Sequence, residues 1–282
     1  MNSKETARLP VNRKEKPIGV FDSGIGGLTV LKEIFRELPY ESAIYLGDTA
    51  RVPYGIRSPE TVTRYSSENV RFLVSQDIKA LVIACNTASS VSLEAIRDMV
   101  SIPVAGVIEP GAKTAAASTK NKRIGVIGTS ATIKSGSYTK AIKALDPGIE
   151  VFGLPCPLFV PLVEEGWTEG RIALMIAEKY LENIKDKGID TLVLGCTHYP
   201  LLKKVISEAM GQGVNLIDSA IETANEIKRI LGAASLLKDS KTDTFREFYV
   251  TDFPDRFQEV GENFLCEKIN YIKKIELETE AS

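Results

Sequence analysis

Short apolar runs recur along the chain, and most are followed by a polar or glycine-containing turn and then by a stretch with helical spacing. Apolar runs that alternate with amphipathic stretches are typical of strands buried between helices. The runs predict strands at residues 18–21, 42–47, 80–84, 102–108, 124–127, 151–154, 191–195, 214–217 and 248–251. The amphipathic stretches predict helices at residues 29–37, 60–75, 91–99, 112–118, 171–187, 201–210, 221–230 and 257–268. The alternation indicates an α/β fold with mainly parallel sheets.

Two cysteines occupy equivalent places in this pattern. Cys85 and Cys196 each follow an apolar strand and precede polar residues that open the next element. A matching strand lies upstream of each, at similar separations of 67 residues from Ile18 to Cys85 and 72 residues from Ile124 to Cys196. Such self-similarity predicts two pseudo-symmetric, doubly wound α/β domains. The two thiols would then face each other across a cleft that holds the active site.

The length and composition are those of an ordinary globular protein. The 282 residues leave room for two domains, and the net charge of -2 gives no support for nucleic-acid binding. No apolar run approaches the length that spans a bilayer, and the start lacks a signal-peptide pattern, so a cytoplasmic location without a membrane partner is expected. Residues 1–17 are polar and lack periodicity, which predicts a flexible N-terminal tail.

No two of the four cysteines lie close together in the sequence, which argues against zinc-ribbon and thioredoxin-like sites. Because His198 is the single histidine and no ligand spacing is present, no metal is expected. Cys156 and Cys266 are expected to be small buried hydrophobic residues. Cys85 and Cys196 lie at predicted helix starts, a position that lowers a thiol pKa from about 8.5 and favours the thiolate.

A pair of equivalent thiols suits the inversion of a carbon centre. One base removes the proton from one face while an acid delivers another to the opposite face, and either group must be able to play either part. The glycine-rich turn at residues 22–27 offers backbone donors for an anion, but its spacing is not that of a dinucleotide site and fits a small carboxylate better. Asp22, Glu164 and His198 are ionisable groups that could tune or relay the protons.

Five motifs carry a resemblance to a known family. They are DSGIGGL at 22–28, GDTARVPYG at 47–55, ACNTAS at 84–89, PLVEEG at 161–166 and GCTHYPLL at 195–202. In this order, over roughly residues 18 to 230, they resemble the motifs of glutamate racemase, in the aspartate/glutamate racemase superfamily. The resemblance implies cofactor-independent interconversion of L- and D-glutamate, which supplies D-glutamate for peptidoglycan. The expected partners are this small-molecule substrate and a second copy of the chain in a homodimer.

The resemblance also implies roles for individual residues. Cys85 would abstract the proton from D-glutamate with help from Asp22, and Cys196 would abstract it from L-glutamate. His198 and a glutamate would assist Cys196, and that glutamate is placed at Glu164, with the adjacent Glu165 as the alternative. The substrate contacts carried over by motif are Asp22, Ser23, Tyr54, Gly55, Asn86, Thr87, Thr197 and His198.

The resemblance further implies two α/β domains with the active site between them. The first domain would comprise residues 18–109 plus 219–282, closed by the C-terminal part of the chain. The second domain, residues 110–218, would be inserted between these segments.

Three other functions fit parts of the pattern. A related racemase or isomerase acting on aspartate or another small dicarboxylate would keep both cysteines. A two-lobed amino-acid-binding protein without catalysis would leave the paired thiols unexplained, and the missing export signal argues against it. A thiol hydrolase with Cys196 as nucleophile and His198 as base would leave Cys85 idle.

Overall fold

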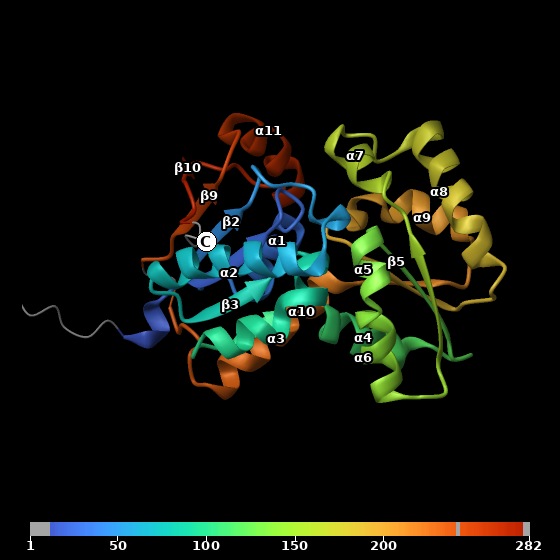
Figure 1. Cartoon of the computed structure of the whole chain (residues 1–282), viewed down its shortest axis with the longest axis horizontal. Helices are drawn as coiled ribbons and strands as arrows, with labels where there is room; N and C mark the ends of the chain where they lie inside the picture. The colour runs from blue at the N-terminus through green and yellow to red at the C-terminus, as the bar shows by residue number, and fades with distance from the viewer. Residues whose placement is uncertain (1–11, 241–242, 279–282) are drawn as a thin grey trace, which may run out of the picture.

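The computed structural model describes residues 12–240 and 243–278 and shows two α/β lobes side by side (Figure 1). The strand pairings among the described residues are parallel in both lobes. Parallel strands are joined by helical crossovers, so helices cover the sheets and the strands become buried apolar runs. The predicted α/β fold class is confirmed. No helix among these residues is long and apolar enough to cross a membrane.

The larger lobe contains a six-stranded sheet in the order β10-β9-β2-β1-β3-β4. Its strands are β1 (Ile18–Asp22), β2 (Ala43–Gly47), β3 (Ala80–Ile83), β4 (Val104–Gly106), β9 (Arg246–Val250) and β10 (Ile272–Lys274). Its helices are α1 (Leu28–Glu37), α2 (Pro59–Ser75), α3 (Asn86–Met99), α10 (Ser219–Ala233) and α11 (Pro254–Leu265). α1 packs against α10 and α11, whereas α2 packs against α3. Alternate side chains of the central strands point into these two separate helical layers.

The smaller lobe contains a four-stranded sheet in the order β6-β5-β7-β8. Its strands are β5 (Arg123–Gly128), β6 (Glu150–Pro155), β7 (Thr191–Gly195) and β8 (Asn215–Asp218). Its helices are α4 (Ile108–Ser118), α5 (Ser130–Ser135), α6 (Ser137–Leu145), α7 (Phe159–Glu164), α8 (Gly170–Lys185) and α9 (Lys203–Met210). Short 3-10 helices are η1 (Arg13–Glu15), η2 (Tyr54–Ile56) and η3 (Tyr199–Leu202).

The two sheets share one strand order. The segment β2-β1-β3-β4 of the larger sheet is repeated as β6-β5-β7-β8 in the smaller sheet. β3 and β7 therefore occupy equivalent places, and Cys85 and Cys196 lie just beyond their carboxyl ends. Ligands of open parallel sheets bind at these ends, so the repeat brings the two cysteines to the functional edges of both lobes.

Residues 129–145 hold more regular structure than the sequence pattern predicted. A loop was expected at Thr129 and Ser130, but Thr129 caps α5 by accepting a hydrogen bond from the backbone N–H of Thr132. Gly136 then adopts a left-handed conformation with φ of 66° and separates α5 from α6. A glycine is favoured there because a Cβ would strain this backbone. Six residues are too few for a recognisable helical period, so α5 was missed.

Two boundaries differ for reasons of backbone chemistry. Residues 109–111 were expected to separate the two halves, but α4 begins at Ile108 and includes them. Pro110 lies in the first turn of α4, where its missing N–H costs no intrahelical hydrogen bond. At the C-terminal end, β10 follows the strand that was expected to be the last one. α11 ends at Leu265, so Cys266 lies beyond the helix and is exposed, and the expectation that it is buried was wrong.

The predicted N-terminal tail is partly ordered. Residues 1–11 lie outside the described residues, but residues 12–17 include η1 and are fixed to the larger lobe. The ammonium group of Lys79, which is fully buried, donates a hydrogen bond of 2.6 Å to the carbonyl oxygen of Lys14. Residues 12–17 therefore have a defined place against the larger lobe, where a distant buried cation uses the backbone of Lys14 as its partner.

Candidate active site

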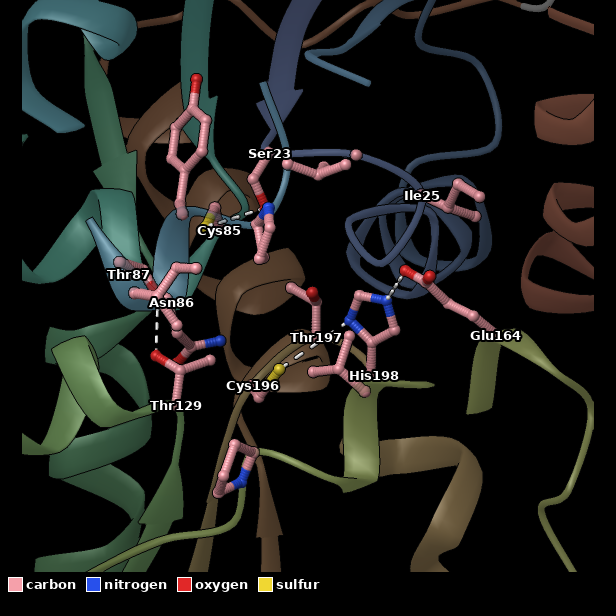
Figure 2. Close-up of a pocket in the computed structure, with 18 of the residues that line it drawn as sticks. Ser23, Ile25, Cys85, Asn86, Thr87, Thr129, Glu164, Cys196, Thr197 and His198 are labelled. Carbon is pink, nitrogen blue, oxygen red and sulfur yellow. Dashed lines mark hydrogen bonds and ion pairs between the residues drawn. The ribbon is translucent and has the colours of Figure 1, made fainter. Parts of the chain in front are cut away.

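A cavity of about 160 Å³ lies between the two lobes (Figure 2). The larger lobe contributes residues 23–25, 52–56 and 85–87, and the smaller lobe contributes 129–130, 196–198 and side chains between 157 and 164. These segments follow β1, β2, β3, β5, β6 and β7, so the cavity lies at the carboxyl ends of both sheets. All the predicted site residues except Asp22 line it, and both Cys85 and Cys196 are among them.

Cys85 lies between β3 and α3 and caps the helix. The backbone N–H of Ala88 points to its sulfur at 3.4 Å, and the thiol lies 3.6 Å from the hydroxyl of Ser23. Burial, together with the nearby carboxylate of Asp22, raises the pKa of Cys85 to about 12. The sequence-based expectation of a lowered pKa was wrong for Cys85, because desolvation of the thiolate outweighs the helix start. This thiol therefore keeps its proton at neutral pH.

Asp22 ends β1 and is fully buried behind the cavity wall. Its Oδ2 accepts a hydrogen bond of 2.9 Å from the backbone N–H of Gly24, while its Oδ1 has no partner among the described residues. Burial raises the pKa of Asp22, and the positive charge of His198 partly offsets this effect. A buried carboxylate with a raised pKa and a free oxygen is suited to accepting a proton from a neighbouring group.

Cys196 has a different neighbour, the imidazole of His198. The sulfur lies 3.8 Å from Nδ1 of His198, and Nε2 of the same ring lies 3.0 Å from Oε1 of Glu164 (Figure 2). Burial by itself would lower the pKa of His198, but hydrogen bonding and charge interactions with Cys196 and Glu164 raise it to about 10. His198 is therefore protonated at neutral pH and holds a positive charge beside the sulfur of Cys196.

The structure distinguishes the two adjacent glutamates. Glu164 ends α7 and faces His198, whose hydrogen bond and charge lower the carboxyl pKa although burial opposes this effect. Glu165 is exposed and forms an ion pair of 3.2 Å with Arg256. The sequence predicted an ordered loop or short turn here, and the structure forms the short helix α7 with Pro161 in its first turn, where proline is tolerated.

Asn86 and Thr87 open α3 and offer polar groups to the cavity. Oδ1 of Asn86 accepts a hydrogen bond of 2.8 Å from the hydroxyl of Tyr138, while its buried Nδ2 has no partner among the described residues. The hydroxyl of Thr87 lies 2.9 Å from that of Thr129 and 3.1 Å from that of Thr132, across the boundary between the lobes. The free amide group of Asn86 is a donor available to a bound anion.

Tyr54 contributes to the cavity wall, but its hydroxyl points elsewhere. The hydroxyl donates to the carboxylate of Asp48 and accepts from Nδ2 of Asn69 at 3.1 Å. Asp48 is fully buried and also receives hydrogen bonds from Arg51 at 2.7 Å and from Thr251 at 3.0 Å. This buried network holds the loop at residues 52–56 against the cavity and occupies the hydroxyl of Tyr54.

Sequence comparison agrees with this geometry. Residues 18–227 match the family described as Asp/Glu/Hydantoin racemase. The chain belongs to this racemase family. It is 56% identical over 265 residues to a glutamate racemase of Geobacter metallireducens, a match that covers 94% of this chain and 98% of that protein. The resemblance inferred from the motifs is thereby confirmed, and the protein belongs to the isomerases.

Two solved glutamate racemases share the fold of this racemase. A crystal structure of an isoform from Bacillus anthracis has 42% sequence identity and a TM-score of 0.90, covering 94% of this chain and 98% of that chain. A structure from Francisella tularensis, determined in complex with D-glutamate, has 39% identity and a TM-score of 0.88, covering 93% and 98% of the two chains. The two-domain architecture of the racemase is thus that of solved relatives.

Several cavity residues of the racemase were not predicted from the sequence. Thr129 and Ser130 follow β5 in the same way that Ser23 follows β1, and they line the smaller-lobe wall. The duplication of the strand pattern was the signal that could have indicated them. Pro157 and Val160 also line the cavity, and no local pattern marks them. Among the described residues of the lining, His198 is the only one whose side chain can carry a positive charge.

Proposed function

We propose that the protein interconverts L- and D-glutamate without a cofactor, using the thiols of Cys85 and Cys196 as the two acid–base groups. The observation that carries the proposal is that cysteines from equivalent ends of β3 and β7 line one cavity, each beside its own ionisable assistant. Two groups from opposing lobes can reach opposite faces of one carbon atom. Inversion requires this arrangement, and a hydrolase would need only one of the thiols.

In the proposed reaction, Cys196 removes the α-proton of L-glutamate and Cys85 delivers a proton to the opposite face. Cys85 is suited to the donor role because its raised pKa keeps the thiol protonated. Protonated His198 supplies a positive charge beside the sulfur of Cys196, which carries negative charge in one half of the reaction. Glu164 holds the imidazole through its other nitrogen. The reverse reaction uses the same groups with exchanged parts.

For D-glutamate, Cys85 must first lose its proton. Asp22 is the ionisable group that we assign to assist Cys85, because one oxygen of its buried carboxylate has no partner among the described residues and its charge acts on the thiol. We assign Asp22 this role from its carboxylate chemistry and its electrostatic effect on the thiol. Asp22 can act from behind the cavity wall, so its absence from the lining is compatible with the proposal.

The carbanion formed at Cα needs stabilisation of its carboxylate as charge moves onto the oxygens. We assign this task to three kinds of donor. They are the Nδ2 group of Asn86, which has no partner among the described residues, the hydroxyls of Thr87 and Thr197, and backbone N–H groups at the start of α3. Ser23 and the backbone at Tyr54 and Gly55 would contact the other end of the substrate. Because the described lining residues include neither Lys nor Arg, and His198 is the one cation among them, recognition of the two carboxylates depends mainly on hydrogen-bond geometry.

The family resemblance supports three further assignments. We propose that the D-glutamate supplies peptidoglycan synthesis, that the protein acts in the cytoplasm and that it forms a homodimer. We also propose that residues 18–109 plus 219–282 and residues 110–218 form its two domains. The division is supported by the fact that each sheet draws its strands from one of these sets.

The test is incubation of the purified protein with L-glutamate in deuterated water, under reducing conditions and without added cofactor. We expect loss of optical activity together with entry of solvent deuterium at Cα of the D-product. Entry of deuterium at Cα of aspartate but not of glutamate would indicate that aspartate is the substrate and would leave the proposed two-thiol mechanism unchanged. Binding of glutamate without any exchange would contradict the racemase proposal.

Single replacements then test the two thiols. Cys85→Ser and Cys196→Ser are each expected to lower turnover by about a thousandfold, because a serine hydroxyl is a far weaker acid than a thiol and does not form its conjugate base at neutral pH. Cys266→Ser is the matched control, because Cys266 is exposed and outside the cavity lining. Full turnover in either active-site variant would contradict the two-thiol mechanism.

A further inference from the structure

The turn after β1 contacts the Cys196 segment of the opposite lobe. The hydroxyl oxygen of Thr29 lies 2.9 Å from the carbonyl oxygen of Thr197, although the two residues are 168 positions apart. Thr29 is buried in the first turn of α1, and Thr197 lies between Cys196, a proposed reacting group, and His198, its proposed assistant. This hydrogen bond therefore joins the larger lobe to the peptide unit that precedes His198.

Close packing reinforces the same contact. A Cβ atom added to Gly26 would overlap with the hydroxyl of Thr197 and would lie 2.5 Å from Nδ1 of His198. The backbone at Gly26 therefore rests directly against both side chains, and only glycine leaves room for them. The hydroxyl of Thr29 adds a hydrogen bond at this contact between the two lobes.

The other end of the turn serves the Cys85 half of the site. The backbone N–H of Gly24 holds Oδ2 of Asp22 at 2.9 Å, and Ser23 lies 3.6 Å from the sulfur of Cys85. These contacts stay within the larger lobe and do not involve Thr29. Loss of the Thr29 hydroxyl would thus remove a contact to the Cys196 segment and leave the contacts around Cys85 unchanged.

We propose that Thr29 is a positioning residue for the Cys196 half of the reaction, acting through its hydrogen bond to the carbonyl of Thr197. The proposal rests on the proposed racemase function. Nδ1 of His198 lies 3.8 Å from the sulfur and Nε2 lies 3.0 Å from Glu164, so rotation of the Thr197–His198 peptide would disturb both distances. Thr29 touches neither substrate nor the reacting atoms, and its effect is transmitted through the backbone.

A competing role for the hydroxyl exists within its own turn. It also lies 2.9 Å from the carbonyl oxygen of Gly26, and a hydroxyl has one proton to donate. If the proton serves Gly26 alone, Thr29 only stabilises the start of α1, and its removal would affect the stability of the protein without favouring either thiol. The two roles predict different kinetic isotope effects.

The experiment compares wild type with Thr29→Val, which keeps the shape of the side chain and removes the hydroxyl. Primary isotope effects on kcat/KM are measured with L-glutamate and with D-glutamate, each deuterated at Cα. When proton transfer at Cys196 becomes slower, it limits the reaction in both directions. The isotope effect with deuterated L-glutamate should therefore rise, and that with deuterated D-glutamate should fall. We expect kcat to decrease about tenfold, as for the loss of one buried hydrogen bond.

Two further variants complete the test. Thr29→Ser keeps the hydroxyl and should restore the wild-type isotope effects. Thr223→Val is the matched control, since the buried hydroxyl of Thr223 bonds to the carbonyl of Ser219 within α10 and should leave both isotope effects unchanged. If Thr29→Val does not fold, as judged by circular dichroism, Thr29→Ala is measured instead.

The outcomes separate this inference from the proposed function. Opposite changes of the two isotope effects in Thr29→Val would support the positioning role. Unchanged or equally changed isotope effects in an active, folded variant would overturn it while leaving the racemase proposal intact. A wild-type protein that does not racemise glutamate would instead overturn the proposed function, on which the inference depends.

Discussion

Nε2 of His198 lies 3.0 Å from Oε1 of Glu164, and this pairing links the residue that precedes η3 to the end of α7 inside the smaller lobe. The opposite ring nitrogen faces Cys196, so the imidazole is held between a carboxylate and a thiol. Together these neighbours raise the pKa of His198 to about 10 against the effect of burial. The protonation of one half of the proposed site therefore depends on Glu164.

Replacement of Glu164 should change the pH dependence of the reaction. In Glu164→Gln, loss of the negative charge lowers the pKa of His198, so the positive charge beside Cys196 is lost at lower pH than in wild type. We expect turnover of L-glutamate to fall about tenfold on the alkaline side of the profile, with a smaller loss at neutral pH. Glu165→Gln is the control, because Glu165 pairs with Arg256 and not with His198. Identical pH profiles for the two variants would refute the prediction.

The same histidine should make the stability of the protein depend on pH. The pKa of His198 is about 10 in the folded protein and 6.5 as the ordinary value, so folding favours the protonated form. Its contribution is fully present below about pH 6.5 and is lost as the pH rises toward 10. Chemical denaturation at several pH values should show a steeper loss of stability over this range in wild type than in His198→Gln. Equal slopes would contradict the assigned protonation.

Gly26→Ala tests the close contact between the turn after β1 and the opposite lobe. The added Cβ would overlap with Thr197 and His198, so these side chains must move from their positions beside Cys196. We expect turnover to fall about a hundredfold, since small displacements of acid–base groups are costly. In the control Gly232→Ala, the nearest atom would lie 3.6 Å away, an ordinary contact, and turnover should be retained. Comparable turnover in the two variants would argue against the contact.

Tyr54→Phe separates the role of the tyrosine ring from that of its hydroxyl. The hydroxyl serves the buried carboxylate of Asp48 rather than the cavity, so its loss should reduce the free energy of unfolding by about 1–2 kcal/mol. The KM for glutamate should change less than about threefold, an effect below ~0.7 kcal/mol. Urea denaturation and steady-state kinetics measure the two quantities. A large rise in KM with unchanged stability would instead indicate that the hydroxyl contacts the substrate.

Lys79 provides a stability test remote from the cavity. Its fully buried ammonium group lies 2.5 Å from Oε2 of Glu41, and burial lowers its pKa. Lys79→Met would leave Glu41 buried without this partner and should destabilise the protein by about 3–5 kcal/mol. Adding Glu41→Leu should recover part of the loss, because the unpaired charge is removed as well. A double variant less stable than Lys79→Met would contradict this account.

Much of the fold followed from the sequence because its determinants are local. Alternation of apolar runs and amphipathic stretches identified nine of the strands within a few residues, and the paired strand ends identified Cys85 and Cys196. The motifs identified the racemase family, which the comparison confirmed. The short helix α5 and the short strand β10 were not predicted, because so few residues show no measurable hydrophobic period.

Contacts between segments that are distant in the sequence could not be predicted from local patterns. Only the packed chain shows that Glu164, and not Glu165, faces His198, and that Thr129 joins the cavity wall. The thiol of Cys85 illustrates the reason. Its place at a helix start predicted a lowered pKa, but burial between the lobes raises it, because the desolvation of a charge is set by every segment that surrounds it. The repeated strand pattern and the two cysteines at equivalent places are local features that can be read along the chain, whereas their partners and their protonation depend on three-dimensional packing.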